Sequence, residues 1–365
     1  MLVLDDGWFG KRDDDTTSLG DWFVDKAKLP CGIDGLAKRI NEEGLKFGLW
    51  FEPEMISEKS KLFEAHPDWR FEVPGRKAHP SRQQYILNLA KEEVCDYLIK
   101  AVGDVLENAN IEYVKWDMNR NMSDVYFAGV PADKQGETMH RYILGLYRVL
   151  ETLTSKFPNV LFEGCSGGGG RNDAGMLYYM PQNWTSDDTD AQERIDIQYG
   201  ASMVYPSITM TAHVSAVPNH QVGRTTPLSF RGAVAMAGNF GYELDLSKMT
   251  DEEKEETIRQ VKLYKQIRST VMFGDLYRLC ENCDGNYYAW MYLSEDKNTA
   301  VVTAAVRRGV PNAPRTRVYL KGLDENAVYE IEGKRFYGSN LMYHGIEISI
   351  TKDYADFMYV LKKVE

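Results

Sequence analysis

The 365-residue chain has few of the features that mark membrane or nucleic-acid-binding proteins. No stretch approaches the roughly 18 to 20 apolar residues that cross a bilayer, and no signal-peptide pattern opens the chain. Acidic residues outnumber basic ones by 54 to 43, which gives a net charge of −11. Nucleic acids and anionic membranes attract clustered lysine and arginine instead. We therefore expect a cytoplasmic protein that binds neither nucleic acid nor a membrane.

Cysteine and histidine are also too scattered to predict a disulfide framework or a metal site. The five cysteines are odd in number, and only one CxxC pair occurs, at 280–283. A structural zinc site of this kind needs a second pair, so we interpret these cysteines as ordinary thiols. The six histidines show no HExxH spacing. The sequence thus predicts no metal and no cofactor.

The first three quarters of the chain alternate short apolar runs with helical patterns, which is typical of βα units around a parallel sheet. Asn88 is expected to cap one helix, and Thr250 with Glu253 forms a capping box for a long final helix. We expect seven strands in this part: 2–4, 47–51, 113–116, 160–162, 181–184, 202–210 and one within 236–246.

The pattern changes after about Gly274, where closely spaced strand candidates are separated by Gly, Asn and Asp. This change predicts a (β/α)8 barrel of the triosephosphate isomerase (TIM) type over 1–275, one strand short, followed by a small antiparallel β-sandwich domain over 276–365. The strands expected in the second domain are 287–293, 299–306, 316–320, 327–332, 346–350 and 357–361.

Two carboxylates stand where a barrel enzyme presents its chemistry. Asp117 ends an apolar strand pattern between Lys115 and Asn119, and the carboxyl ends of barrel strands carry catalytic groups. Asp187 follows another strand-like run, just before a helix start. Two carboxylates on separate strand ends suggest acid and base work on a glycosidic bond. Asp117 taken alone is also compatible with a residue that caps the next helix.

Five motifs, in one order, resemble those of the bacterial α-galactosidases of glycoside hydrolase family 36. The resemblance runs from residue 2 to the C-terminus, and a single one of these motifs would carry little weight. The motifs are Asp-Asp-Gly-Trp at 5–8, Trp-Phe-Glu-Pro-Glu-Met at 50–55, Lys-Trp-Asp-Met-Asn-Arg at 115–120, Cys-Ser-Gly-Gly-Gly-Gly-Arg at 165–171 and Ser-Asp-Asp-Thr-Asp-Ala at 186–191.

The resemblance implies a retaining exo-α-galactosidase that acts on melibiose- and raffinose-type sugars. Asp117 matches the family's nucleophile and Asp187 its acid/base. Asp188 stands where many relatives carry Asn, and its charge would raise the pKa of Asp187 if the two side chains face the same way. Asp190 is interpreted as a carboxylate of the first helical turn rather than a catalytic one.

The resemblance also assigns residues to sugar binding. Asp5 and Asp6 match the pair that binds O4 and O6, although adjacent aspartates also suit a divalent cation. Trp50 is expected as an exposed ring that stacks on the sugar, with a core position as the alternative. The implied substrate-binding residues are Asp5, Asp6, Trp50, Arg82, Lys115, Asn119, Cys165, Gly167 and Gly168.

Other functions remain open at this point. An α-N-acetylgalactosaminidase or a galactosyl transferase belongs to the same superfamily, and a homo-oligomer is possible. In the family, the first barrel strand precedes the Asp-Asp-Gly-Trp motif, so we expect this chain to begin at the second strand. That expectation leaves an inactive, truncated sugar-binding fragment as a further alternative.

Overall fold

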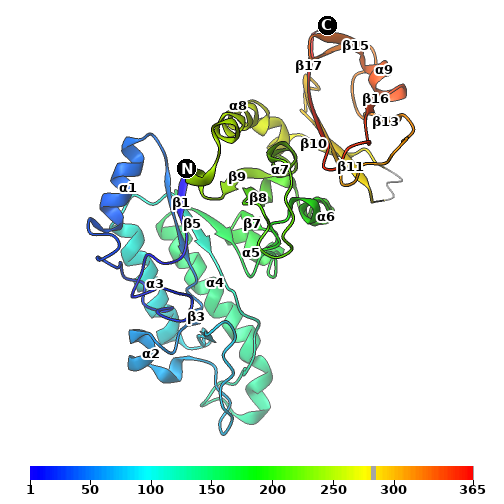
Figure 1. Cartoon of the computed structure of the whole chain (residues 1–365). Coiled ribbons are helices and arrows are strands. Elements are labelled where there is room, and N and C mark those ends of the chain that lie inside the picture. The colour runs from blue at the N-terminus through cyan, green and yellow to red at the C-terminus, as the bar shows by residue number, and fades with distance from the viewer. Residues whose placement is uncertain (281–284, 365) are drawn as a thin grey trace. The chain divides into compact units, whose positions relative to one another are not determined.

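The computed structural model describes residues 1–280 and 285–364, and it divides into two compact units (Figure 1). We call Met1–Trp184 the N-terminal unit and Thr185–Glu365 the C-terminal unit. Cys283, the second cysteine of the CxxC pair, lies outside the described residues. In the part of the chain that is described, no helix is both long and apolar enough to cross a membrane.

The N-terminal unit contains a parallel sheet with the strand order β1-β2-β5-β6-β7. Strand β2, which lies between β1 and β5, is buried along its whole length, as expected for a parallel strand covered on both faces. A small antiparallel pair, β3 with β4, lies outside this sheet. The strands are β1 (Leu2–Leu4), β2 (Phe47–Phe51), β3 (Met55–Ile56), β4 (Tyr85–Ile86), β5 (Tyr113–Trp116), β6 (Leu161–Gly164) and β7 (Gln182–Trp184).

Helices follow these strands, and their apolar faces join the strands in one continuous core. Helices α3 and α4 lie side by side (Figure 1), and the approach of α4 to the segment just before α3 requires a glycine. A Cβ atom on Gly145 of α4 would stand 1.9 Å from the carbonyl oxygen of Leu89. The helices are α1 (Gly32–Glu42), α2 (Lys61–Ala65), α3 (Glu92–Glu107), α4 (Thr138–Lys156) and α5 (Ala174–Tyr179), with 3-10 helices η1 (Pro67–Trp69) and η2 (Ala132–Glu137).

The prediction that Asn88 caps a helix is wrong. Helix α3 begins at Glu92, its N-cap is Lys91, and Lys91 makes no side-chain capping bond. The Asn88 side chain instead accepts a hydrogen bond from the backbone N–H of Ala90, two residues on. An Asn that closes such a local turn competes with the helical conformation.

In the C-terminal unit, β8 (Met210–Ser215) pairs in parallel with β9 (Asn239–Glu243). The long helix α8 begins at Asp251, and the capping box of Thr250 and Glu253 is confirmed. The helices here are α6 (Ala191–Ala201), α7 (Leu228–Ala235) and α8 (Asp251–Phe273), with 3-10 helices η3 (Ser207–Thr209) and η4 (Leu246–Lys248).

The prediction of a strand over 202–210 is wrong for most of that range. The backbone N–H groups from Ser202 to Tyr205 still bond to carbonyls three or four residues back, so the turn that ends α6 continues. The side chains of Met203 and Val204 are exposed. The strand begins only at Met210, after η3.

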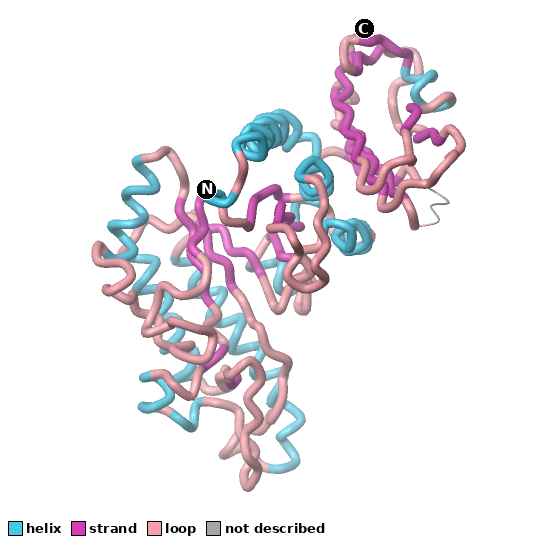
Figure 2. The backbone as a smooth tube through the Cα atoms, in the orientation of Figure 1, coloured by secondary structure: helices cyan, strands magenta, loops and turns pink. Residues whose placement is uncertain are grey.

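The remaining strands pair antiparallel, as the sequence predicted (Figure 2). One sheet has the order β10-β11-β12-β17-β14-β15, and β13 pairs with β16 in a second. β10, β15 and the short helix α9 (Gly338–Tyr343) were not expected from the sequence. The strands are β10 (Asp275–Arg278), β11 (Tyr287–Leu293), β12 (Thr299–Val306), β13 (Thr316–Val318), β14 (Val328–Ile331), β15 (Lys334–Tyr337), β16 (Ile346–Ile348) and β17 (Asp356–Lys363).

The fold class is therefore as predicted. Within the described residues, seven strands of barrel type alternate with helices, and an antiparallel β region follows them. In the described part of the chain, each barrel-type strand is followed by a loop that leads to a helix. The carboxyl ends of the strands are the place to look for a site.

Candidate active site

Three neighbouring strands of the N-terminal unit end at the same level. Phe51 of β2 pairs with Trp116 of β5, and Trp116 pairs with Gly164 of β6. The residues that follow these ends are Glu52, Asp117 and Cys165. Because parallel strands share one carboxyl edge, these three side chains lie close together.

Asp117 is held by three N–H groups. One oxygen, Oδ1, accepts from the backbone of Met118 at 2.8 Å. The other, Oδ2, accepts from Nδ2 of Asn119 at 2.6 Å and from Nε1 of Trp50 at 3.2 Å. No described helix begins between Asp117 and Ala132, so the alternative of a helix cap is wrong. The carboxylate is fixed in one orientation at the end of β5.

Trp50 does not lie where the sequence suggested. Its side chain is only 3% exposed and packs against Phe9 and Trp22, so the expectation of an exposed stacking ring is wrong. A buried indole usually finds a hydrogen-bond partner, and here that partner is Asp117. Trp50 therefore orients the carboxylate rather than offering an open ring face.

The first motif supplies two differently paired carboxylates. Asp5 forms an ion pair with Lys115 at 3.1 Å, and more than half of the Asp5 side chain stays exposed. Asp6 accepts three hydrogen bonds from the buried Arg12, with a closest distance of 2.8 Å. Among the described residues, no cluster of three or more His, Cys, Asp or Glu suits a metal ion. The alternative of a cation at Asp5 and Asp6 gains no support.

The loop after β6 begins with Cys165, whose side chain lies beside Asp117. Gly167 and Gly168 have φ of 55° and 86°, which glycine adopts without strain. Burial, together with the nearby Asp117, raises the pKa of the Cys165 thiol, so this side chain is a neutral group in the site. The loop's cation, Arg171, binds Glu54 through two hydrogen bonds of 2.7 and 2.9 Å. It is therefore already paired, which argues against a phosphate cradle.

Two buried glutamates, Glu52 and Glu54, were not predicted from the sequence as residues of the site. Glu54 accepts from Arg171, Tyr142 and the indole of Trp116, so it ties β5, α4 and the glycine loop together. Glu52 accepts hydrogen bonds from Gln84 and from the backbone of Asn119. Its burial is the main reason why its pKa is raised to about 8, and the nearby Asp117 is the second. The signal was two carboxyl groups in the otherwise apolar run 50–55, since buried charges need partners.

Arg82 stands apart from this cluster. It is exposed in the turn 81–84, with φ of 51°. Gln84, at the end of the same turn, is buried and reaches Glu52. The turn therefore contributes to the strand ends through Gln84.

In the C-terminal unit, Asp187 lies exposed in the turn before α6. The neighbouring carboxylates have local tasks: Asp188 accepts from the backbone of Asp190, and Asp190 is the N-cap of α6. Asp190 also pairs with Arg224. The expectation that Asp190 is a structural helix-start residue is confirmed, at the N-cap instead of the first turn. The Asp188 side chain turns back to the backbone.

A buried arginine holds this turn. Arg194 is 2% exposed and donates to the carbonyl of Ser186 at 2.9 Å and to the hydroxyl of Thr185 at 2.9 Å. Burial lowers the pKa of Arg194 to about 10, which leaves it charged at neutral pH. Arg194 therefore holds the backbone just before Asp187 in place. The sequence did not reveal these contacts.

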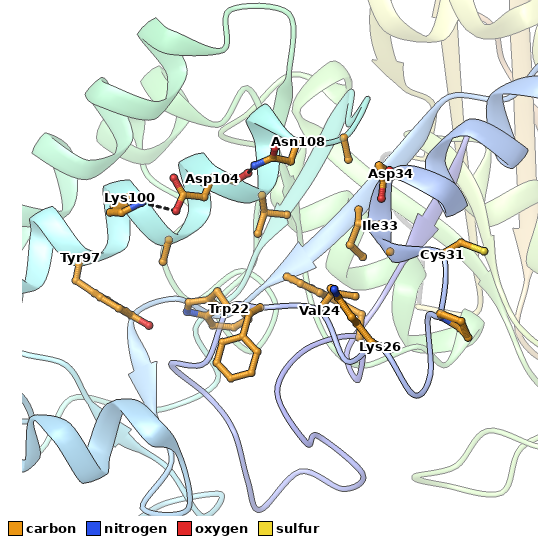
Figure 3. A pocket seen from close by; sticks show the side chains of 17 residues that line it. Trp22, Val24, Lys26, Cys31, Ile33, Asp34, Tyr97, Lys100, Asp104 and Asn108 are labelled. Atoms are coloured by element: carbon orange, nitrogen blue, oxygen red, sulfur yellow. Dashed lines mark hydrogen bonds and ion pairs between the residues drawn. The ribbon is translucent and has the colours of Figure 1, made fainter.

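A separate cavity of about 610 Å³ lies between α1, α3 and the segment 22–31 (Figure 3). Lys100 and Asp104 at its wall pair with each other at 2.6 Å. Trp22 lines it, and the Trp22 Nε1 has no hydrogen-bond partner among the described residues. None of the strand-end residues Glu52, Asp117 and Cys165 lines this cavity, so it is not the candidate active site.

Comparison with known proteins gives consistent results. A family model described as Melibiase matches residues 1–274, and one described as Glycosyl hydrolase family 36 C-terminal domain matches 287–361. All of this chain aligns with α-galactosidase AgaA of Geobacillus stearothermophilus at 54% identity and with α-galactosidase Mel36A of Lactobacillus acidophilus at 51%. In both cases the aligned part is 50% of the relative.

Solved structures agree. AgaA in complex with raffinose superimposes with a TM-score of 0.96 at 54% identity, over 99% of this chain and 51% of AgaA. The α-galactosidase of Lactobacillus brevis gives 0.97 at 48% identity, over 100% of this chain and 50% of that protein. The chain thus spans about half the length of the relatives it matches. With a family model covering three quarters of it, the chain belongs to the melibiase family, and its C-terminal region to the C-terminal domain of glycosyl hydrolase family 36.

Proposed function

We propose that the protein is a retaining exo-α-galactosidase that hydrolyses terminal α-galactosides of the melibiose and raffinose type. The observation that carries this proposal is Asp117, a carboxylate fixed by three N–H groups at the end of a barrel strand in a member of this family. A fixed, ionised carboxylate at such a place is suited to attack a sugar carbon.

The reaction proceeds in two displacements. An oxygen of Asp117 bonds to C1 while the C1–O bond to the leaving group breaks, and Asp187 gives that departing oxygen its proton. Water then gives its proton to Asp187 and attacks C1, which releases galactose and frees Asp117. Each displacement inverts C1, so the product keeps the α configuration.

Complexes of a relative support these roles. AgaA structures in complex with raffinose and with stachyose each carry a replaced aspartate. The two replaced aspartates stand as far apart along AgaA as Asp117 and Asp187 do along this chain. Substitution of a catalytic carboxylate is a means of keeping a substrate intact in a crystal, and we assign the equivalent tasks here to Asp117 and Asp187.

Recognition of galactose falls to the polar groups around Asp117. The Asp5–Lys115 pair combines an acceptor and a donor, which suits the axial O4 hydroxyl that distinguishes galactose from glucose. The small Cys165 and the glycines at 167 and 168 let the chain come close to the 2-hydroxyl. Arg82 and Asp6 are assigned to the outer hydroxyls on the family resemblance.

The competing activity is that of an α-N-acetylgalactosaminidase. An acetamido group at C2 would need space where Cys165, 2% exposed, closes the loop against Asp117. We therefore expect aryl α-galactoside to be cleaved at least about 100-fold faster than its 2-acetamido analogue, since buried sites reject added bulk. Assay of the two substrates side by side decides between the activities.

Replacement of the nucleophile tests the proposal directly. Asp117→Gly should lose essentially all turnover and still bind galactose, and added azide should restore cleavage of an activated aryl α-galactoside. The product should be β-galactosyl azide, because azide attacks from the face that the carboxylate occupied. Recovery of the α-azide, or normal turnover of the variant, would remove Asp117 from this role.

The cytoplasmic location and a homo-oligomeric state stay predictions. Cell fractionation tests the first, and light scattering of the purified protein tests the second.

A further inference from the structure

Glu52 is a buried acidic neighbour of the proposed nucleophile, and the proposed mechanism gives it no task. It follows the last residue of β2 and its side chain is 1% exposed. A carboxyl group at such a place is unfavourable unless its oxygens are hydrogen-bonded. Its position directly beside Asp117 makes a second negative charge there more costly still.

One oxygen of Glu52 connects two segments of the site. Its Oε1 accepts a hydrogen bond from Nε2 of Gln84 at 3.0 Å and another from the backbone N–H of Asn119. Gln84 belongs to the segment before β4, and Asn119 belongs to the loop after β5. The carboxyl group is therefore anchored on one side and holds the Asn119 backbone on the other.

Asn119 in turn holds Asp117. Its side-chain amide donates to Oδ2 of Asp117 at 2.6 Å. A continuous path of hydrogen bonds thus runs from Gln84 through Glu52 and Asn119 to the carboxylate that attacks the sugar. The Asn119 backbone that Glu52 holds thus carries the amide that contacts Oδ2.

We propose that Glu52 is a positioning residue of the reaction: it fixes Asn119 so that the Asn119 amide aims the Asp117 carboxylate at C1. This inference rests on the proposed function. The raised pKa of Glu52, about 8, agrees with it, because a neutral acid can accept these bonds without repelling Asp117. A displacement of about 1 Å in an attacking group can cost about 100-fold in rate, so the effect belongs in kcat.

Two substitutions of Glu52 separate its role from its charge. Glu52→Gln keeps an oxygen acceptor and should retain kcat within about 3-fold. Glu52→Met keeps the approximate volume but has no such acceptor, and it should lower kcat about 10- to 100-fold with little change in KM or in galactose binding. The matched control is Glu163→Gln, which alters another buried carboxyl group of the same sheet, one that contacts Tyr113. It should change the melting temperature and leave kcat alone.

A double-mutant cycle shows whether Glu52 acts through Asn119. Asn119→Ala keeps the backbone N–H and removes the amide that contacts Asp117. In that background Glu52→Met should lower kcat less than about 3-fold further, while its effect on the melting temperature stays the same. A merely structural Glu52 would lower kcat by the same factor in both backgrounds.

The outcomes distinguish the inference from the proposed function. If the unsubstituted protein does not cleave aryl α-galactosides, the proposed function fails. If it does, and Glu52→Met keeps full kcat or loses it equally in both backgrounds, the positioning role is wrong. Should Glu52→Met not fold, Gln84→Leu replaces it in the cycle, because it removes the anchor and keeps the carboxyl group; a kcat unaffected by Gln84→Leu then overturns the inference.

Discussion

Two carboxyl groups one strand apart have opposite surroundings. Asp117 receives three N–H donors on its two oxygens. Glu52 is buried beside Asp117, and its hydrogen bonds from Gln84 and from the Asn119 backbone fall on a single oxygen. Neighbouring carboxyl groups whose environments differ in this way take different protonation states and therefore different tasks. The raised pKa of Glu52 suits it to be a neutral acid beside Asp117.

The titration of Glu52 predicts a pH-dependent stability. Its pKa is raised to about 8, above the ordinary 4.5, first by burial and then by Asp117. The folded protein thus holds this proton more tightly than the unfolded chain, so the contribution of Glu52 to stability is fully present below about pH 4.5 and is lost as the pH rises through 8. Glu52→Gln lacks this contribution. Calorimetric melting temperatures at pH 5, 6.5 and 8 should show the variant gaining on the unsubstituted protein toward pH 8; parallel curves would contradict the raised pKa.

The acid role of Asp187 predicts a dependence on the leaving group. Asp187→Ala should slow raffinose cleavage at least about 100-fold, because the departing oxygen is basic and needs a proton. For an aryl galactoside with an acidic phenol, the same substitution should lower the rate of the galactosylation step far less. Asp188→Ala is the control, since Asp188 turns back to the backbone of Asp190. Equal losses on both substrates in Asp187→Ala, or the leaving-group profile in Asp188→Ala, would contradict the assignment.

At the scale of elements, the sequence predicted most helices and strands because their apolar spacing and caps are local. The capping box of Thr250 and Glu253 is an example. The errors occurred where the local sequence is compatible with more than one secondary structure. Val204 has a β-branched side chain of the kind enriched in strands, yet Met203 and Val204 extend the end of a helix, with both side chains exposed. The short strand β15 is largely exposed, so its sequence lacks the alternation of apolar and polar residues that predicts a half-buried strand.

The contact of α4 with the segment just before α3 yields a prediction at this scale. Gly145→Ala would place a methyl group 1.9 Å from the carbonyl oxygen of Leu89, which is backbone and cannot swing away. We expect a destabilisation of about 1 to 3 kcal/mol, the usual cost of overpacking. Gly200→Ala is the matched control in α6, where no atom lies within 4 Å of the added carbon. It should stabilise by up to about 1 kcal/mol, because alanine favours helix. Urea unfolding measures both, and a neutral Gly145→Ala would contradict the close packing.

For the whole molecule, the order of five motifs was enough to predict the family and the strand-end position of Asp117. It did not reveal how the site is supported, because that depends on contacts between residues far apart in the chain. Arg171 reaches Glu54 across more than 100 positions, and Gln84 reaches Glu52 from a separate turn. A buried glutamate shows in a sequence only as a charged letter in an apolar run. Its hydrogen-bond partners can be identified only from the three-dimensional structure.

Metal independence is a prediction about the molecule as a whole. Among the described residues, no group of three or more His, Cys, Asp or Glu could hold an ion, and Asp5 and Asp6 are paired with Lys115 and Arg12. The proposed double displacement needs only Asp117 and Asp187. Prolonged treatment with EDTA, followed by gel filtration, should leave both kcat and the melting temperature unchanged. The control is an equal incubation with EDTA saturated by calcium, which separates chelation from ionic strength. A loss that zinc or calcium restores would show that Asp5 and Asp6 leave their cationic partners to bind a metal, and the assignment of these two residues to the sugar hydroxyls would then be wrong.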